Sequence, residues 1–206
     1  MEFSEVIKRR KMVRAFTNEP VPEGATERLL RAANRAPSAG FCQGYSFLVL
    51  EGPEQTVSLW DLFYADAAAI PDREEQERAE IDALSRAPLV IVPLANKDVY
   101  LDEYARKLGW DDRDEAHWAA PYWYIDTGFA ALLILLAVVD EGLGAVFFGL
   151  QPAIIEPFRE RYGVPGDWRP IGAIAVGHPD PGSDPVVPAR PSERKPLAEL
   201  VHRGRW

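Results

Sequence analysis

The sequence predicts one α+β domain over residues 1–206, with a mixed central sheet, helices on both faces and an extended C-terminal arm. Short, strongly apolar segments alternate along the chain with longer segments whose apolar residues recur at helical spacing. Residues 87–95 are apolar almost without interruption, as expected of a strand covered on both faces. With 206 residues, 47% of them hydrophobic, the chain is long enough to enclose one sizeable core.

The helices and strands follow from the spacing of apolar residues and from the residues that interrupt it. Helical spacing predicts a first helix over 3–10 and a second over 22–36. Residues 123–141 are apolar on nearly every side, so we expect a buried helix that Gly142 terminates. The other predicted helices cover 53–68, 73–85 and 152–161, and the predicted strands cover 46–51, 87–95, 145–148 and 169–176. We expect irregular structure over 97–122 and a proline-rich arm over 179–206.

Composition excludes several classes of function. The formal net charge of −9 argues against nucleic acid as a partner, because a phosphate backbone requires a basic surface. The longest apolar run, 128–139, is too short to cross a bilayer, which needs roughly 20 residues. We therefore expect a cytoplasmic protein without a membrane segment. The single cysteine, Cys42, excludes an internal disulfide, and His117, His178 and His202 lack the spacing of metal ligands, so no metal is expected.

Basic residues gather near both ends of this acidic chain. Residues 1–14 carry five basic and two acidic side chains, and residues 186–206 carry the same numbers. One interpretation is that both ends are simply solvated. The other is that they hold a small anion between them, since several closely spaced cations can bind one phosphate.

Two further segments have the composition of a ligand site. Within residues 35–45, a helix ends at Pro37 and small residues follow, with Ser38 and Gln43 as hydrogen-bonding groups beside aromatic side chains. A planar heteroaromatic ring needs such groups, although a helix cap and a turn have a similar composition. The strand end at Phe148 and Gly149 can present backbone N–H groups to a ligand, or can be a buried strand and its turn.

Four segments, in chain order, resemble motifs of the FMN-dependent nitroreductase family. Residues 10–16 (RKMVRAF) resemble the family's opening Arg-Arg-Ser-Val-Arg-x-Phe motif. Residues 37–47 resemble its Pro-Ser-x-x-Asn-x-Gln-Pro-Trp-x-Phe motif. Residues 141–144 (EGLG) look like the exit of the family's central dimerisation helix, and residues 194–197 (RKPL) look like its terminal arm. The resemblance covers nearly the whole chain. The positions that match in the second motif are Pro37, Ser38, Gln43 and Phe47.

This resemblance implies a nitroreductase-like fold and an enzyme that takes electrons from NAD(P)H onto FMN. It implies ping-pong reduction of a nitro compound, a quinone or a similar conjugated acceptor. The flavin supplies the redox chemistry, so no catalytic side chain is expected. It also implies a homodimer whose C-terminal arm crosses to the other subunit. The implied cofactor-binding residues are Arg10, Lys11, Met12, Arg14, Pro37, Ser38, Ala39, Gln43, Phe148, Gly149, Arg194 and Lys195.

The chain also departs from the family motifs. Met12 stands where a hydroxyl usually contacts the flavin, Phe41 stands at the usual Asn, and Gly44-Tyr45 replaces Pro-Trp. Phe41 is similar to what the flavin-destroying branch, 5,6-dimethylbenzimidazole synthase, shows there, but that branch usually carries an acid at the Met12 position. Flavin fragmentation, reductive dehalogenation and a flavin-binding protein without turnover therefore stay open as alternatives.

Residues 97–122 fall where nitroreductases commonly place the segment that covers the flavin. Their aromatic side chains suit a flat acceptor, and their acidic side chains disfavour an anionic one. The alternative is a solvated excursion whose aromatic side chains pack inward. The residues expected to contact substrate are Phe41, Tyr104, Trp110 and Trp118.

Overall fold

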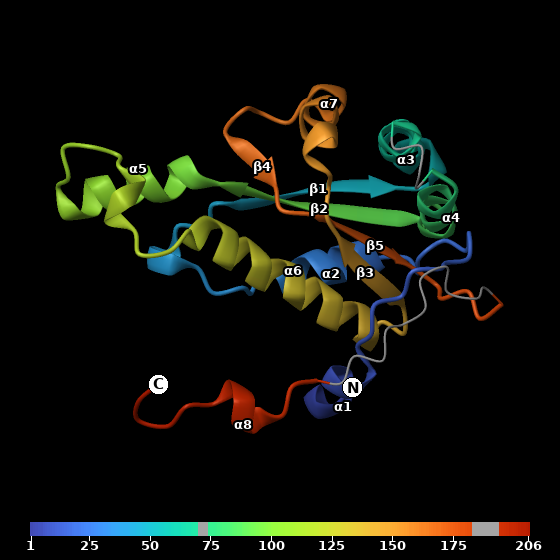
Figure 1. Cartoon of the computed structure of the whole chain (residues 1–206), viewed down its shortest axis with the longest axis horizontal. Helices are drawn as coiled ribbons and strands as arrows, with labels where there is room; N and C mark the ends of the chain where they lie inside the picture. Colours follow the sequence, from blue (N-terminus) through green and yellow to red (C-terminus); the bar gives the residue numbers. More distant parts are fainter. Residues whose placement is uncertain (70–73, 183–193) are drawn as a thin grey trace.

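The computed structural model describes residues 1–69, 74–182 and 194–206, and these form a sheet covered by helices on both faces (Figure 1). The strands of the described chain are β1 (Tyr45–Glu51), β2 (Leu89–Asn96), β3 (Gly144–Phe148), β4 (Trp168–Pro170) and β5 (Ala173–Gly177). They run in the order β1–β2–β5–β3, with β4 paired to β2, and every pairing between them is antiparallel. Among the described residues, the parallel component of the expected mixed sheet is one bridge, between Met12 and Ala145.

The helices form two layers. On one face lie α2 (Ala25–Ala33) and α6 (Tyr122–Asp140), and on the other lie α3 (Pro53–Ala68) and α7 (Pro152–Tyr162) (Figure 1). Three further helices pack at the margins or project from them: α1 (Phe3–Arg9) on α6, α4 (Glu74–Leu84) on α3, and α5 (Lys97–Leu108), which projects beyond the end of the sheet. The short helix α8 (Leu197–Leu200) lies in the C-terminal tail.

The apolar sequence of strand β2 is explained by its place at the centre of the sheet. Every residue of β2 is buried, because helices cover both faces of the sheet. Successive side chains alternate between the two layers. Leu89 and Ile91 pack with α2 and α6, whereas Val90 and Val92 pack with α3 and α7.

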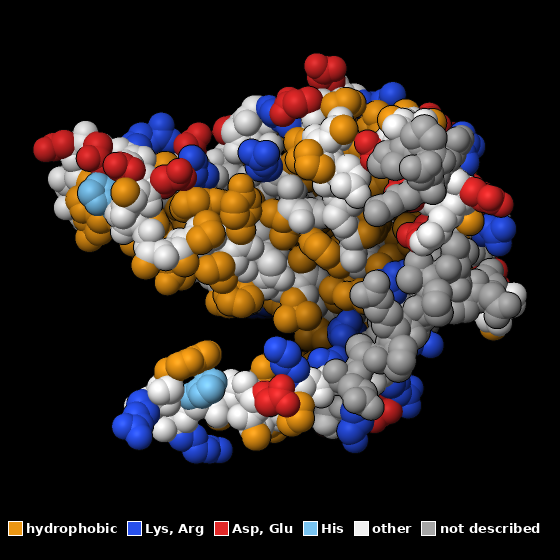
Figure 2. Space-filling view, viewed as in Figure 1, with side chains coloured by type: hydrophobic (Ala, Val, Ile, Leu, Met, Phe, Trp, Pro, Cys, Tyr) orange, Lys and Arg blue, Asp and Glu red, His pale blue; other side chains and the backbone are white. Residues whose placement is uncertain are grey.

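Helix α6 is apolar on its outer side as well as toward the core. Its inner side chains pack against α2 and the sheet, but Phe129 and Leu132 remain 43% and 46% exposed. With 19 residues and a mean hydropathy of 1.8, α6 has the length and composition of a membrane span, a property that buried core helices share. One such helix is weak evidence for a membrane. Figure 2 shows apolar side chains gathered on this face of the molecule.

Two sequence expectations for the elements were wrong. Residues 97–122 are not irregular throughout, because they begin with the 12-residue helix α5. The side-chain oxygen of Asn96 caps this helix by accepting from the N–H groups of Asp98 and Val99, and Gly109 ends it in the left-handed conformation. The strand expected over 169–176 is divided into β4 and β5, which pair with different parts of β2. Part of the predicted arm, residues 183–193, lies outside the described residues.

Candidate flavin-binding site

The basic segment near the N-terminus lies along the edge strand β3. The N–H of Val13 donates to the carbonyl oxygen of Ala145 at 2.9 Å, next to the bridge between Met12 and Ala145. Gly144 allows this approach, since a Cβ there would lie 2.8 Å from Cγ2 of Val13. Phe16 is fully buried and anchors the far end of the segment. Residues 10–14 are therefore fixed beside the strand that ends at Phe148.

Arg10, Lys11 and Arg14 carry charges that no described residue neutralises. None of the three makes an ion pair within the part of the chain that the structure describes, whereas the neighbouring Arg9 pairs with Glu5 at 2.6 Å. A cavity of about 220 Å³ opens where this segment crosses the end of α6, and of these three cations Lys11 lines it. Its lining includes Lys11, Val13, Gly142 and Gly144. Uncompensated cations beside a cavity of this kind suit an anionic group such as a phosphate.

The second motif forms a tight turn between α2 and β1, held by hydrogen bonds to its own residues and to α6. The hydroxyl oxygen of Ser38 accepts from the N–H of Gln43 at 2.8 Å. The N–H of Ala39 donates to Oδ2 of Asp126 at 2.7 Å. The Ser38 hydroxyl and the Ala39 N–H, which the sequence assigned to the flavin, thus also hold the turn.

Two residues of the turn, Phe41 and Gln43, have an unusual backbone conformation. Phe41 and Gln43 have φ angles of 58° and 52°, in the left-handed region that non-glycine residues seldom occupy. Phe41 is 75% exposed. The amide of the Gln43 side chain makes no hydrogen bond to any described residue, so it is free to bind a polar ring edge. Strained backbone of this kind is typical of functional sites.

At the end of β3, the side chain of Phe148 packs inside the protein, whereas the backbone at Gly149 is open to solvent. The Phe148 ring stacks on Trp60 at 5.7 Å between centroids and meets Phe63 edge-on, within the layer of α3. Gly149 is exposed, and a Cβ added there would meet nothing within 4 Å. A planar ligand can therefore approach the backbone at Gly149, while the Phe148 ring belongs to the core.

The structure brings the motif at 10–16 and the motif at 141–144 together, and the motif at 37–47 lies apart from both. The turn contacts the start of α6 through Asp126, whereas the basic segment and β3 meet the other end, beyond Asp140. At 1.5 Å per residue, these two points on α6 are separated by roughly 20 Å. Arg194 and Lys195 are exposed, and neither makes an ion pair with a described residue.

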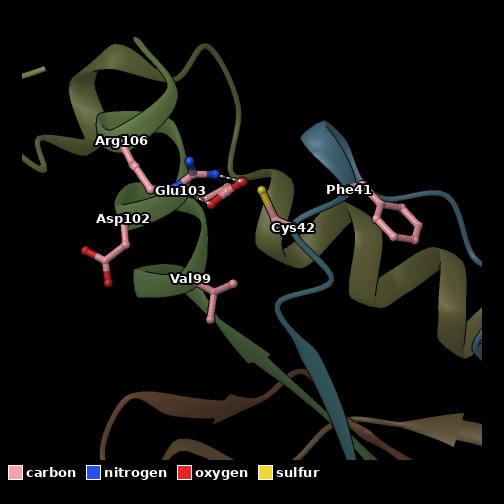
Figure 3. Close-up of a pocket in the computed structure, with 6 residues that line it drawn as sticks. All are labelled: Phe41, Cys42, Val99, Asp102, Glu103 and Arg106. Atoms are coloured by element: carbon pink, nitrogen blue, oxygen red, sulfur yellow. Dashed lines mark hydrogen bonds and ion pairs between the residues drawn. The ribbon is translucent and has the colours of Figure 1, made fainter. Parts of the chain in front are cut away.

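Helix α5 and the residues after it form a compact projection beside the turn. A cavity of about 430 Å³ lies between this helix and the turn, lined by Phe41, Cys42, Val99, Asp102, Glu103 and Arg106 (Figure 3). Several of the acids here are neutralised locally: Arg113 bonds to both Asp98 and Asp102, and Arg106 and Lys107 hold the pKa of Glu103 below its usual range. Burial raises the pKa of the Cys42 thiol, so it is a packing group and not a reactive thiolate.

The aromatic residues predicted to contact substrate pack largely on one another. The rings of Tyr104 and Trp118 lie 4.3 Å apart, and Trp110 stacks on His117 at 4.2 Å. All three predicted side chains of this projection are half-buried, and Phe41 stands apart from them as the exposed member of the set. Contact between these rings and an acceptor stays a prediction.

Sequence reasoning grouped Tyr100 with the aromatic residues that suit a flat acceptor and did not identify its contact with Asp126, although both side chains are buried at the turn. The hydroxyl of Tyr100 donates to Oδ2 of Asp126 at 2.8 Å, and burial raises the pKa of that phenol. The available signal was a carboxylate inside the most apolar helix of the chain, because such a group needs hydrogen-bond donors. For metals, no group of three or more ligating side chains occurs among the residues that the structure describes.

The α+β fold holds residues 10–14 along the edge strand β3, with Lys11 beside a cavity and an open backbone at Gly149, and this surface suits an anionic, planar ligand. The profile of the Nitroreductase family matches residues 7–178, and the chain belongs to this family. Family membership supports an oxidoreductase activity.

Known proteins resemble the chain over most of its length. It is 27% identical to an NADH dehydrogenase of Thermus thermophilus, over 94% of this chain and 91% of that protein. It is 22% identical to an NADPH-dependent oxidoreductase of Staphylococcus epidermidis, over 98% and 73% of the two chains. The nitroreductase CinD of Lactococcus lactis, solved with nicotinic acid, has the same fold, with a TM-score of 0.71, 21% identity and coverage of 89% and 93%.

Proposed function

We propose that the protein is an FMN-dependent oxidoreductase that takes electrons from NADH or NADPH and reduces a small conjugated acceptor. The observation that carries this proposal is the set of three cations, Arg10, Lys11 and Arg14, which make no ion pair with a described residue and lie along β3, with Lys11 lining a cavity. An anionic cofactor accounts for these charges, and family membership supports a flavin as that cofactor.

We assign different residues of the chain to the phosphate and to the ring of the cofactor. Arg10, Lys11 and Arg14 would hold the phosphate, Gln43 would bond to the polar edge of the ring, and the backbone at Gly149 would lie against the ring. The flavin would supply the redox chemistry, and these residues would supply its position and electrostatics. Met12, in place of the usual hydroxyl, is 36% exposed and contributes its backbone to the bridge with Ala145.

We propose that two copies complete the site. The cavity of about 220 Å³ is smaller than the roughly 300–1,000 Å³ of ordinary small-molecule sites, so one chain encloses part of a flavin. The turn that carries Gln43 lies at the far end of α6 from this cavity. In a homodimer built on the apolar outer face of α6, the turn of one copy is available to the cavity of the other.

The proposed acceptors are nitro compounds and quinones. CinD of Lactococcus lactis has been solved with 4-nitrophenol and with chloramphenicol, which supports flat nitroaromatic acceptors for a protein of the same fold. NADH and NADPH both occur in the names of relatives, so both are candidates as the reductant. The cytoplasmic location expected from the sequence stays part of the proposal.

The decisive experiment is spectroscopic. Purified protein is loaded with FMN and its visible absorbance is followed while NADH or NADPH is added without oxygen. We expect the flavin band to bleach and then to recover on addition of a quinone or 4-nitrophenol. Bleaching with loss of the flavin on return to air indicates flavin fragmentation, and recovery only with a halogenated aromatic, with halide released, indicates dehalogenation. Bound FMN that no nicotinamide reduces indicates a binding protein without turnover.

A further inference from the structure

The turn at residues 38–43 is connected to two helices by a hydrogen-bond network that the proposed function does not use. Asp126 on α6 is 2% exposed, and its Oδ2 accepts from the N–H of Ala39 at 2.7 Å and from the hydroxyl of Tyr100 at 2.8 Å. Tyr100, on the first turn of α5, is fully buried. Its hydroxyl also lies 3.5 Å from that of Ser38, which accepts from the N–H of Gln43. The network therefore joins α5 and α6 to both halves of the turn.

Burying the side chain of Asp126 in the apolar helix α6 costs free energy. No cation of the described chain pairs with Asp126, so its charge is stabilised by hydrogen bonds alone. A leucine would avoid the cost of desolvating a charge and would suit an otherwise apolar helix. The two hydrogen bonds offset this cost, and they tie α6 to the turn and to α5.

The turn itself needs external support. Phe41 and Gln43 both occupy the left-handed region, where a non-glycine residue costs free energy and persists only when its surroundings hold it. Asp126 holds the turn at Ala39, Ser38 holds it at Gln43, and the ammonium group of Lys107 on α5 donates to the carbonyl oxygen of Gly40 at 2.8 Å. The ring of Tyr100 fits against Gly44, where a Cβ would lie 2.4 Å from Cε2 of the ring.

We propose that Asp126, together with Tyr100, is a positioning residue that holds the turn at 38–43 in the conformation that presents Gln43 to the flavin. This inference rests on the proposed function for the identity of the ligand, but not for the support of the turn. Asp126 does not touch the ligand. It acts through the backbone of Ala39, and Tyr100 acts through Asp126 and Ser38.

The first test measures the turn in the flavin-free protein. In Asp126→Leu, the acceptor of both hydrogen bonds is replaced by an apolar side chain of similar size, and in Tyr100→Phe the hydroxyl is removed with the ring kept. We expect the amide hydrogen exchange of Ala39 and Gln43 to accelerate roughly tenfold or more in both variants, while β2 amides keep their protection. The matched control is Tyr64→Phe, because Tyr64 donates to Asp82 between α3 and α4, away from the turn. Unchanged exchange at the turn, or equal acceleration throughout the sheet, would overturn the proposal.

The second test asks whether the turn serves the flavin. FMN dissociation constants are measured for wild type, Asp126→Leu, Gln43→Ala and the double variant. If Asp126 acts through the turn, each single variant weakens binding about tenfold, and the double variant is little weaker than the poorer single one. The visible circular dichroism of bound FMN should change in Asp126→Leu and stay unchanged in Tyr64→Phe. Additive losses, or wild-type affinity in Asp126→Leu, would overturn the link to FMN.

The two tests separate the inference from the proposed function. If the wild-type chain does not bind FMN at all, the proposed function fails and the link to the flavin fails with it. The exchange measurement still decides whether Asp126 holds the turn, since it uses the flavin-free chain.

Discussion

At the scale of single residues, a basic side chain that forms an ion pair within the protein differs in role from one that does not. Arg28 bonds through two nitrogens to the Glu141 carboxylate, at 2.7 and 2.8 Å, and so joins α2 to the end of α6. Arg10, Lys11 and Arg14 have no such partner within the described chain. Arg28, whose charge is paired, stabilises the fold, whereas the cations of the basic segment are available to a ligand.

The pair of Arg28 and Glu141 should give a pH-dependent contribution to stability. The hydrogen bond from Arg28, more than any other cause, lowers the pKa of the Glu141 carboxyl. A lowered pKa in the folded state contributes stability above the unfolded pKa, and this contribution is lost as the pH falls through the folded value. We therefore expect Glu141→Gln to lower Tm by roughly 1–3 °C at pH 7. The difference should begin to shrink below the ordinary glutamate pKa of roughly 4.3 and continue to shrink as the pH falls through the lower folded value. A difference that stays constant between pH 7 and pH 3 in thermal scans would contradict this.

Arg14 provides the residue-scale test of the phosphate site. Replacing Arg14 with Ala removes a charge-assisted contact and should weaken FMN binding roughly tenfold or more, as measured by titration of flavin fluorescence. The matched control is Arg31→Ala, an exposed arginine on α2 outside the basic segment, which should bind FMN as wild type does. Equal affinities for wild type and Arg14→Ala would remove Arg14 from the site.

At the scale of elements, sequence periodicity predicted what is local and missed what depends on contacts between distant segments. It placed the helix at 53–68 with the bounds that the structure shows, and the buried helix to within one residue at each end. It missed α5, because a helix with few apolar residues depends on the Asn96 cap and on the burial of Tyr100. It also missed the network of Ala39, Tyr100 and Asp126, whose members come from three elements far apart in the sequence.

In the candidate site too, the sequence predicted local motifs but not the contacts between distant segments. The basic segment and the turn were each visible as short motifs, because a run of cations or a Pro-Ser-Ala-Gly sequence is a local signal. Their positions at opposite ends of α6 were not predictable, since these depend on how the segment 10–16 pairs with β3 and how the turn contacts Asp126. The roles of these residues toward FMN stay predictions.

The projection formed by α5 and residues 109–121 should influence the choice of acceptor through charge. Its seven acidic and four basic residues leave a net negative charge, although ion pairs with Arg113, Arg106 and Lys97 place the charges close together. We expect neutral and cationic quinones or nitroaromatics to have a higher kcat/KM than carboxylated analogues of equal reduction potential at low salt. The gap should shrink as salt screens the field. Equal rates at low salt would show that this projection does not select by charge.

At the scale of the whole molecule, two apolar surfaces are left uncovered by the described residues. One is the outer face of α6, with Phe129 and Leu132 exposed. The other is the tail at residues 194–206, in which every residue is exposed, including Leu197, Leu200 and Trp206. The tail runs away from the body with open space beside it (Figure 2). Apolar surfaces of this kind mark sites of association, which supports the proposed homodimer.

The dimer prediction can be tested with two matched charge insertions. Leu132→Glu places a carboxylate on the outer face of α6 and should shift the protein toward monomer, with loss of bound FMN because the site is then incomplete. Val57→Glu is the control, because Val57 is a similarly exposed aliphatic residue, 52% accessible, on α3 in the opposite layer. Light scattering across micromolar concentrations, with flavin content measured on the same samples, gives both readouts. A wild-type protein that is monomeric with FMN bound, or a Leu132→Glu variant that stays dimeric, would show that the outer face of α6 does not join two copies.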